Sequence, residues 1–455
     1  MTFEKLELLV LGTAVCCFGF FRWPKSAYEL IRPRFAIPFL FWLATFLPMI
    51  SYGDPYTESN VYQRAREDSG RTAAFFIMTC LLGFWVGFAS PIGVYLAKPM
   101  ALVTNKLPIR PQRFGILAYL VGGFSLFLIA ILNGPAFLGL EGGGPLIQLP
   151  ESLGRPVAVI MVIGTAVSAA ALGASWPAKG SQSLFGNAFR LLFLLALCTP
   201  NMAMFSRGSA LPVLICFAAF SVRHRRLNWV VAILAVGFTA LCGHAGLAGR
   251  GVMGHYAGVF PYLQFLFTES LSRWDEMFSI FTGAVDAYTP LCVTMQAVKS
   301  TDIHAVTWTD WLLIHIPIPY SWGFQPELTT DLSYFIRGAS ARWYTLGLFG
   351  DLWAHFGWAG WAVMAVLGML YRMLDHLIIG QDLFDEHDHL NPYMFLMFTS
   401  YYAMMVGLFN NFRSWTTLFF YPLFLTVAIL LVFRFFIAHR SQENVDGSLD
   451  YRAAG

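Results

Sequence analysis

Apolar and polar positions alternate along this chain in long blocks rather than residue by residue. Runs of about 20 apolar residues, the length that an α-helix needs to cross a bilayer, recur along most of the sequence. Short polar segments that hold most of the charges separate these runs. The pattern predicts an all-α polytopic membrane protein with about eleven transmembrane helices. The predicted spans cover residues 7–21, 35–52, 73–97, 114–132, 156–177, 191–205, 208–222, 229–247, 346–371, 393–409 and 415–437.

One long polar stretch, residues 249–345, breaks this rhythm, and its many charges cannot all lie in lipid. Within it, residues 278–298 are apolar enough to be considered as a span, which would invert the orientation of everything after them. We favour a surface-lying or re-entrant helix there, because Asp286 and Pro290 interrupt the segment. The chain therefore divides into N-terminal transmembrane helices (1–248), one large extracytoplasmic loop with short helices (249–345), C-terminal transmembrane helices (346–440) and a polar tail expected to be disordered (441–455).

The distribution of lysine and arginine predicts the orientation of the helices. Cytoplasmic loops of membrane proteins are enriched in these residues. One set of alternate loops is rich in them, whereas in residues 53–71 on the other side three arginines are offset by four acidic residues. The rule places the N-terminus outside, the C-terminus inside and the large loop outside. The basic residues of the first set are Arg22, Lys25, Arg32, Arg34, Lys98, Lys106, Arg110, Arg113, Lys179, Arg190, Arg223, Arg225, Arg226, Arg434 and Arg440.

Composition narrows the possible functions. The 455 residues are 57% hydrophobic and 12% charged, about half the charged fraction of a soluble domain. The net charge of +3 comes from loop residues that mark topology, so we expect no nucleic-acid partner. Seven cysteines, mostly in apolar runs, show no zinc spacing, and we expect neither a metal nor a cofactor. The acidic segment 382–389 reads as a solvated cytoplasmic loop rather than a metal site.

Asp351 and His355 are candidates for acid–base chemistry. They stand four residues apart, so on a helix they share one face about one turn into the ninth predicted span. One interpretation is a mutually satisfied pair packed against other helices. The other is a general base, either Asp351 or His355, that deprotonates an acceptor hydroxyl. A carboxylate at this depth must face protein or a wet cavity, because facing lipid is costly.

Arg207 is a candidate anion ligand, because it lies between two apolar runs on the predicted outer side. An arginine in this position often extends to lipid headgroups. It is equally suited to bind a phosphate at the mouth of a cavity, since the guanidinium fork matches phosphate oxygens. Position alone leaves both interpretations open.

Three further arginines lie in the large loop. Arg273 opens an amphipathic segment and has Asp275 and Glu276 as nearby acidic partners, whereas Arg337 and Arg342 precede the ninth span. Ordinary loop charges are the commoner arrangement for all three. Together with Arg207, arginines from separate loops could instead bind a pyrophosphate and stabilise it as a leaving group.

Several short motifs resemble the bacterial oligosaccharide repeat-unit polymerases (the O-antigen polymerase, Wzy-like family). The proline-rich segments Ile316–Pro319 and Gln325–Pro326 precede a helix whose sequence from Gly350 to Gly360 is similar to the family's Gly-Glu-x-x-x-x-Phe-Gly-x-x-Gly. Ser206-Arg207-Gly208 is similar to the family's Ser-Arg-Gly pattern. Asp351 stands where the family has glutamate, and this shorter side chain leaves the identity of the base open.

The resemblance implies a glycosyltransferase of the bacterial inner membrane that polymerises undecaprenyl-pyrophosphate-linked repeat units on the periplasmic side without a metal. It implies pyrophosphate contacts from Arg207, and next from Arg273, Arg337 and Arg342, with Asp351 or His355 as the base. The partners would be the lipid-linked oligosaccharide and membrane lipids, with a chain-length regulator and a flippase as further possibilities.

Other functions remain open from the sequence. An O-antigen-ligase-like transferase would use the same donor chemistry. A transporter or flippase of lipid-linked glycans predicts internal repeats and charges near the bilayer midplane, which we do not find. A membrane-bound acyltransferase or a sorting peptidase is a third class, and the peptidase would need a cysteine nucleophile. Cys242 and His244 lie close in sequence near the outer side, but two residues apart on a helix they point to different sides.

Overall fold

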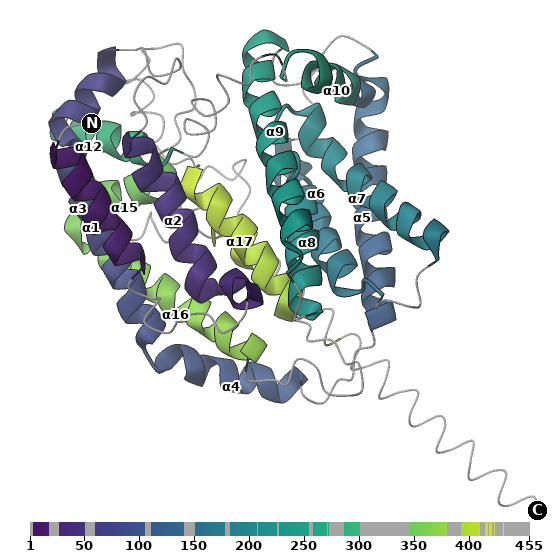
Figure 1. The fold of residues 1–455 in the computed structure, drawn as a ribbon, viewed down its shortest axis with the longest axis horizontal. Helices are drawn as coiled ribbons and strands as arrows, with labels where there is room; N and C mark the ends of the chain where they lie inside the picture. The colour runs from purple at the N-terminus through teal and green to yellow at the C-terminus, as the bar shows by residue number, and fades with distance from the viewer. Residues whose placement is uncertain are drawn as a thin grey trace, which may run out of the picture.

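The computed structural model describes residues 3–17, 27–50, 60–104, 111–140, 151–177, 183–206, 208–224, 227–253, 258–270, 272, 286–300, 346–379, 393–409 and scattered positions from 415 to 431. Every regular element in these segments is a helix (Figure 1). Five helical stretches are long and apolar enough to cross a membrane, which confirms the predicted class in its coarse form. They are Tyr62–Ala89, Gln112–Leu138, Leu184–Ala203, Trp229–Gly246 and Gly347–Ile378.

The described helices form two groups that stand side by side (Figure 1). The first contains α1 (Phe3–Cys17), η2 (Ala27–Ile31), α2 (Pro33–Ile50), α3 (Asn60–Ala89), α4 (Ile92–Thr104), α12 (Tyr288–Ser300), α15 (Gly347–Phe356), η6 (Gly357–Ala359) and α16 (Gly360–Ile379). The second contains α5 (Pro111–Leu138), α6 (Glu151–Ala174), α7 (Leu184–Ala203), α8 (Leu211–Arg223), α9 (Trp229–Met253) and α10 (Val259–Thr268). Helix α17 (Tyr393–Phe409) packs against α15, α16 and α2 of the first group and against α6 and α8 of the second, so it joins them.

Glycines let the longest helices of the first group approach closely. A Cβ at Gly83 or Gly87 of α3 would collide with main-chain carbonyl oxygens of α16. The reciprocal collision, between a Cβ at Gly368 of α16 and the carbonyl oxygen of Phe84, shows that the contact is close from both sides. Small residues of this kind drive helix association inside membranes, where burial of apolar surface contributes little.

Burial separates core helices from lipid-facing ones. The most apolar window of α3 is 67% buried, whereas those of α5, α7 and α9 are only 22% to 28% buried. Large apolar side chains such as Leu120 and Phe185 are exposed on α5 and α7. An exposed apolar face of this extent suits contact with acyl chains rather than water.

The predicted span 73–97 is wrong at both ends. Helix α3 begins at Asn60, because the polar segment before the apolar run contains the good helix formers Gln63 to Glu67, and the helix continues through it. It ends at Ala89, since Pro91 has no amide hydrogen to continue the ladder. Helix α4 then begins at Ile92 and lies across one end of the molecule (Figure 1).

The predicted span 346–371 is interrupted. Helix α15 ends at Phe356, and Gly357 adopts a positive φ of 52° before α16 begins at Gly360. Only glycine adopts this backbone conformation readily, so the presence of Gly357 explains where the helix breaks. Other predicted spans agree closely: the span 393–409 coincides with α17, and the span 208–222 corresponds to α8.

The segment 278–298 is resolved in part. Its first residues lie outside the described part of the chain, but from Tyr288 it forms α12, a 13-residue helix. Helix α12 packs against α3, α15 and α2, and nearly all its residues from 288 to 297 are buried. Burial raises the pKa of the Cys292 thiol to about 12, so this thiol packs as a small apolar group. The described part of the segment is therefore an internal helix rather than a surface-lying one.

Candidate functional site

Asp351 and His355 form a pair on α15, as their spacing predicts. The Nδ1 atom of His355 lies 3.1 Å from Asp351 Oδ1 and 2.8 Å from the main-chain oxygen of Asp351. Both side chains are buried, with 10% and 4% of their surfaces exposed. Because both neighbours of Nδ1 are acceptors, this nitrogen carries the hydrogen in the neutral ring. The second nitrogen, Nε2, then holds a lone pair.

The Nε2 atom of His355 is buried, and no hydrogen-bond partner reaches it within the part of the chain that the structure describes. A buried polar atom without a partner is costly and marks a position that another group is expected to occupy. The neutral ring therefore presents a proton acceptor at Nε2, held in place through Nδ1 by Asp351.

Helix α15, which carries the pair, packs against α12 and α17. At the start of α15, a Cβ on Gly347 would lie 2.8 Å from the main-chain oxygen of Leu408 on α17. A Cβ on Gly350 would lie 3.0 Å from the hydroxyl of Thr294 on α12. Because α17 also packs against α6 and α8, α15 contacts the helix that joins the groups.

Aromatic rings fix the helix break just after the pair. Trp353 and Trp358, on either side of Gly357, meet edge to face with ring centroids 5.5 Å apart. Both also pack on Phe76 of α3, at 5.0 Å and 5.9 Å. Edge-to-face contacts of this kind favour one arrangement of rings. They hold the end of α15, and with it His355, against α3.

The four arginines predicted to bind pyrophosphate, Arg207, Arg273, Arg337 and Arg342, lie outside the described residues. The structure does place residues that flank the first two. Ser206 and Gly208 on either side of Arg207 form a turn between α7 and α8, and Ser270 and Ser272 precede Arg273 just after α10.

Helix α7 is followed by a strained residue, Phe205, two positions before Arg207. The amide of Phe205 donates to Met202 O and that of Ser206 to Asn201 O, the pattern with which many helices end. Glycine normally occupies the position of Phe205, whose φ is 47°. Helix α10 reaches the same point, since the amide of Gly258 donates to Ala203 O.

Buried hydrogen bonds hold this turn to α9 and α10. The hydroxyl of Tyr262 donates to Cys242 O at 2.8 Å and stands 2.8 Å from Ser209 Oγ. His244 Nδ1 lies 2.8 Å from Ser270 Oγ, which ties the start of the segment leading to Arg273 to α9. All five side chains are buried. The flanks of Arg207 and Arg273 therefore rest on one cluster of side chains, which the sequence analysis did not anticipate beyond the Ser-Arg-Gly pattern.

The same geometry bears on the cysteine-nucleophile alternative. Cys242 is fully buried, and its main-chain oxygen accepts hydrogen bonds from Ser209 and Tyr262. His244 is engaged with Ser270. The Cys242 thiol is packed in the apolar core of this cluster rather than presented to a substrate.

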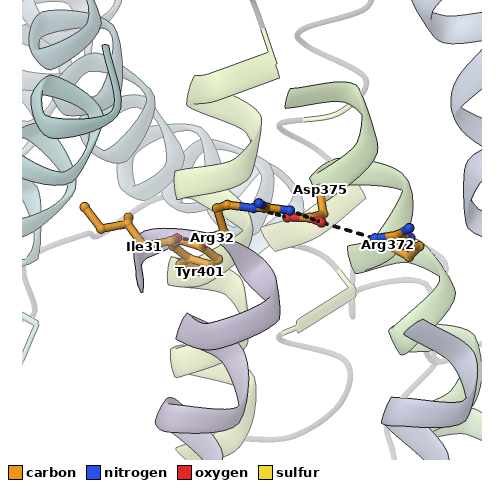
Figure 2. A network of polar contacts seen from close by, with 5 residues as sticks. All are labelled: Ile31, Arg32, Arg372, Asp375 and Tyr401. Carbon is orange, nitrogen blue, oxygen red and sulfur yellow. Dashed lines mark hydrogen bonds and ion pairs between the residues drawn. The ribbon is translucent and has the colours of Figure 1, made fainter. Parts of the chain in front are cut away.

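A second buried carboxylate, Asp375, lies on α16 (Figure 2). Arg32 donates to both of its oxygens, from Nε at 3.1 Å and from the terminal nitrogen at 2.9 Å. Arg372 approaches it at 3.4 Å and stacks over the ring of Phe88. The sequence analysis missed this network because its predicted span ended at residue 371 and left these charges in a loop. An Arg and an Asp three apart at the end of an apolar run were the available signal.

A third ion pair also escaped the sequence analysis, which counted Arg66 among balanced loop charges. Arg66 of α3 donates to Asp286 at 2.7 Å and to Thr289 Oγ1 at 2.7 Å. Asp286 accepts from the first amides of α12, so it caps that helix. This arrangement fastens α12 to α3 and leaves Arg66 neutralised.

Comparison of the chain with protein-family models, with curated proteins and with solved structures gives no match. Within the described residues, no group of three His, Cys, Asp or Glu side chains is placed to hold a metal ion. The acidic segment 382–389 lies outside those residues.

Proposed function

We propose that this protein is a membrane glycosyltransferase that polymerises lipid-pyrophosphate-linked oligosaccharide units. The observation that carries the proposal is the Asp351–His355 pair, with an acceptor nitrogen available at Nε2 and a carboxylate behind Nδ1. A histidine held in this way is suited to take a proton from a hydroxyl. The short motifs that resemble the repeat-unit polymerases supply the substrate class.

In this mechanism His355 is the base and Asp351 orients it. Nε2 takes the proton from the acceptor hydroxyl while that oxygen forms a bond to the anomeric carbon of the donor sugar. The bond between this carbon and the phosphate oxygen breaks, and the lipid pyrophosphate leaves with the electron pair. Asp351 stabilises the imidazolium that results, and the carbonyl dipoles in the last turn of α15, where His355 lies, act in the same sense.

Arg207 is the first ligand of the departing pyrophosphate, with Arg273, Arg337 and Arg342 beside it. Arginine pairs with phosphate oxygens in a bidentate manner, and several such contacts stabilise charge that develops on a leaving group. Ser209, two residues after Arg207, is held by buried hydrogen bonds to Tyr262 and Cys242, and this support favours the assignment, because preorganised contacts are the effective ones. No metal is required for this step.

The proposed orientation places this chemistry on the periplasmic side of the bacterial inner membrane. Its support is the basic loops, which by the positive-inside rule mark the cytoplasmic face. Among described residues, Arg223 at the end of α8 donates to main-chain oxygens at the end of α6, and Arg190 near the start of α7 stacks on Trp176. Asp351 and His355 lie on α15, which packs against α12, and Figure 1 draws α12 at the end of the molecule opposite α4.

A glycan gel of a deletion strain tests the proposal. The strain carries the wild-type gene, Arg207→Ala or His355→Gln at matched protein level. We expect the deletion and both variants to lose long polymer and to accumulate single lipid-linked units, since a missing general base lowers the rate by about 100- to 10,000-fold. His376→Gln, at the far end of α16, is the matched control and should restore full-length polymer.

The gel, together with the membrane face on which lipid-linked units accumulate, separates this function from its alternatives. If the deletion strain makes polymer of unchanged length but fails to attach it to its final acceptor, the protein is the ligase. If lipid-linked units accumulate on the cytoplasmic face, it is a transporter of those units. If polymer and its attachment are both unchanged, the transferase proposal fails.

A further inference from the structure

The second helix group has basic residues at one end and a single carboxylate in its helices. The sequence has no aspartate or glutamate from residue 69 to 140 or from 152 to 268. The carboxylate of helices α5 to α10 is therefore that of Glu151, at the start of α6. Arg113 near the start of α5, Arg190 near the start of α7 and Arg223 at the end of α8 have no acidic residue in their own helices. This distribution of charge favours an anionic partner.

Arg190 is held by aromatic side chains from outside its own helix. Its guanidinium lies over the ring of Trp176, just after the end of α6, at 5.7 Å from the ring centroid. The hydroxyl of Tyr119 on α5 also interacts with the guanidinium. The Tyr119 ring packs in turn on Phe189 and Phe193 of α7, with centroids 5.5 Å and 4.8 Å away. The guanidinium is therefore fixed in place, although Arg190 is partly exposed.

The backbone beneath Trp176 is held by basic side chains rather than by carboxylates. Arg223 donates to the main-chain oxygens of Ala174 and Trp176 at 2.7 Å and 2.9 Å. His224 Nε2 lies 3.1 Å from the same oxygen of Trp176. Within the described residues, no carboxylate forms an ion pair with Arg190. A guanidinium has several N–H donors in its plane, and a ring against its face with one nearby hydroxyl leaves most of them for an anion.

Exposed apolar side chains lie on both sides of Arg190 along α7. Leu184 and Phe185 precede it, and Leu191 and Leu192 follow it. The exposed apolar face of a membrane-spanning helix contacts acyl chains, and the end of such a helix lies at the depth of the lipid headgroups. Arg190 is in the second turn of α7, so its charge lies where the phosphate of a phospholipid is found.

We propose that the Arg190 guanidinium binds the phosphodiester of an anionic phospholipid, whose acyl chains lie along the exposed apolar residues of α7. The fork of the guanidinium matches phosphate oxygens. The lack of carboxylates in this region favours a lipid with a net negative charge over a zwitterionic one. In the proposed orientation this lipid belongs to the cytoplasmic leaflet. The site lies in the other helix group from Asp351 and His355, and the inference does not depend on the proposed function.

Native mass spectrometry of the purified full-length protein, titrated with phosphatidylglycerol in detergent, tests the proposal. We expect wild type to bind phosphatidylglycerol more tightly than phosphatidylcholine. Arg190→Gln should weaken binding of phosphatidylglycerol about tenfold, as for the loss of a hydrogen bond to a charged group. Arg190→Lys keeps the charge without the fork, so its affinity should lie between those of Arg190→Gln and wild type. Sodium phosphate at an equal concentration should not displace the lipid, because it has no acyl chains.

Arg71→Gln is the matched control. Arg71 also lies over an aromatic ring, that of Phe75 at 5.9 Å, and it is an exposed residue of a membrane-spanning helix, α3. It follows Glu67 and Asp68 by about one helical turn, so negative charge lies beside it. The variant loses the same charge as Arg190→Gln and should bind phosphatidylglycerol like wild type.

The outcomes that overturn the proposal concern the lipid and the residue separately. Equal affinity of wild type for the two lipids would show that the charge of the headgroup is not recognised. Displacement by sodium phosphate would indicate a phosphate site rather than a lipid site. Binding by Arg190→Gln equal to that of wild type, or to that of Arg71→Gln, would show that Arg190 is not the ligand. If Arg190→Gln does not fold, Arg190→Lys decides the question, and affinity equal to that of wild type would exclude recognition by the guanidinium fork.

Discussion

Asp351 and Asp375 are two buried carboxylates on one helical unit, α15 and α16, and they are neutralised in different ways. Asp351 lies beside His355, whose charge can change, and the far nitrogen of that ring has no hydrogen-bond partner among the described residues. Asp375 accepts both bonds of the Arg32 fork and has Arg372 beside it, and its side chain is 1% exposed (Figure 2).

The partner of each carboxylate decides what it can do. An arginine keeps its charge at any relevant pH, so the Arg32–Asp375 pair is fixed and can only fasten α16 to the junction of η2 and α2. A histidine exchanges its proton near neutral pH, so the Asp351–His355 pair can move charge. On this comparison we propose a structural role for Asp375 and a chemical role for Asp351, although a buried carboxylate of either kind is costly in a membrane interior.

The substitution Asp351→Asn tests the difference between the two carboxylates most directly. The amide fills the same space but presents no charge to the ring and can stabilise the wrong tautomer. We expect the rate of glycan transfer by purified protein to fall by about 1,000-fold, equivalent to about 4 kcal/mol. The melting temperature should stay close to that of wild type.

Lipid-linked units extracted from the deletion strain serve as substrate for that measurement. His376→Gln provides a variant on the same helical unit that should keep its rate. A rate for Asp351→Asn within a few fold of wild type would show that the pair is only a packing feature.

Asp375→Asn should give the opposite result. Removing the charge leaves two guanidinium groups around a neutral amide, and breaking a buried ion pair from one side costs about 3 kcal/mol. SDS-induced unfolding in mixed micelles measures this loss. The transfer rate per folded molecule should be unchanged, and a large fall in that rate would mean that Asp375 also belongs to the site.

The sequence predicted the helical class well, because apolar runs of bilayer length leave few alternatives. The predicted spans agree closely with α17 and α8. The predictions were wrong where the end of a helix does not coincide with a change in hydropathy. The polar residues from Asn60 extend α3 by about three and a half turns before the predicted start. Gly357 interrupts an apolar run that hydropathy treats as continuous. Hydropathy indicates whether a segment favours lipid or water, but it does not indicate where the helical backbone begins, bends or ends.

The candidate site could be predicted only where its residues are close together in the sequence. Asp351 and His355 are one helical turn apart, so their spacing alone brings them together. Asp375 and Arg32 are 343 residues apart, and no periodicity links them. Tyr262 and Ser209 likewise meet only through the packing of α10 on α7 and α9.

The substitution Arg32→Lys tests how the Arg32–Asp375 ion pair stabilises the fold. Lysine keeps the charge of Arg32 but offers a single ammonium in place of a fork that meets both oxygens of Asp375. We expect a loss of about 2 kcal/mol in the same unfolding assay, between wild type and Asp375→Asn. A loss equal to that of Asp375→Asn would show that the geometry of the fork carries the whole interaction, and no loss would show that charge alone suffices.

The smallest expected effect is that of a substitution at Gly357, which separates α15, the helix of Asp351, from α16, the helix of Asp375. Its φ of 52° and ψ of −135° suit glycine alone, yet a Cβ there meets nothing within 4 Å, so alanine is opposed only by backbone strain. We expect Gly357→Ala to cost about 1 kcal/mol of stability. We also expect it to lower the transfer rate severalfold, because the strain turns the end of α15 and moves His355.

Gly123→Ala is the matched control for Gly357→Ala. Gly123 lies within α5, and a Cβ there also has nothing within 4 Å, but the helical backbone accepts alanine without strain. That variant should be unchanged or slightly more stable, since alanine is the better helix former. If Gly357→Ala matches Gly123→Ala in both stability and rate, the break between α15 and α16 plays no part in orienting His355, and the base is held by Asp351 alone.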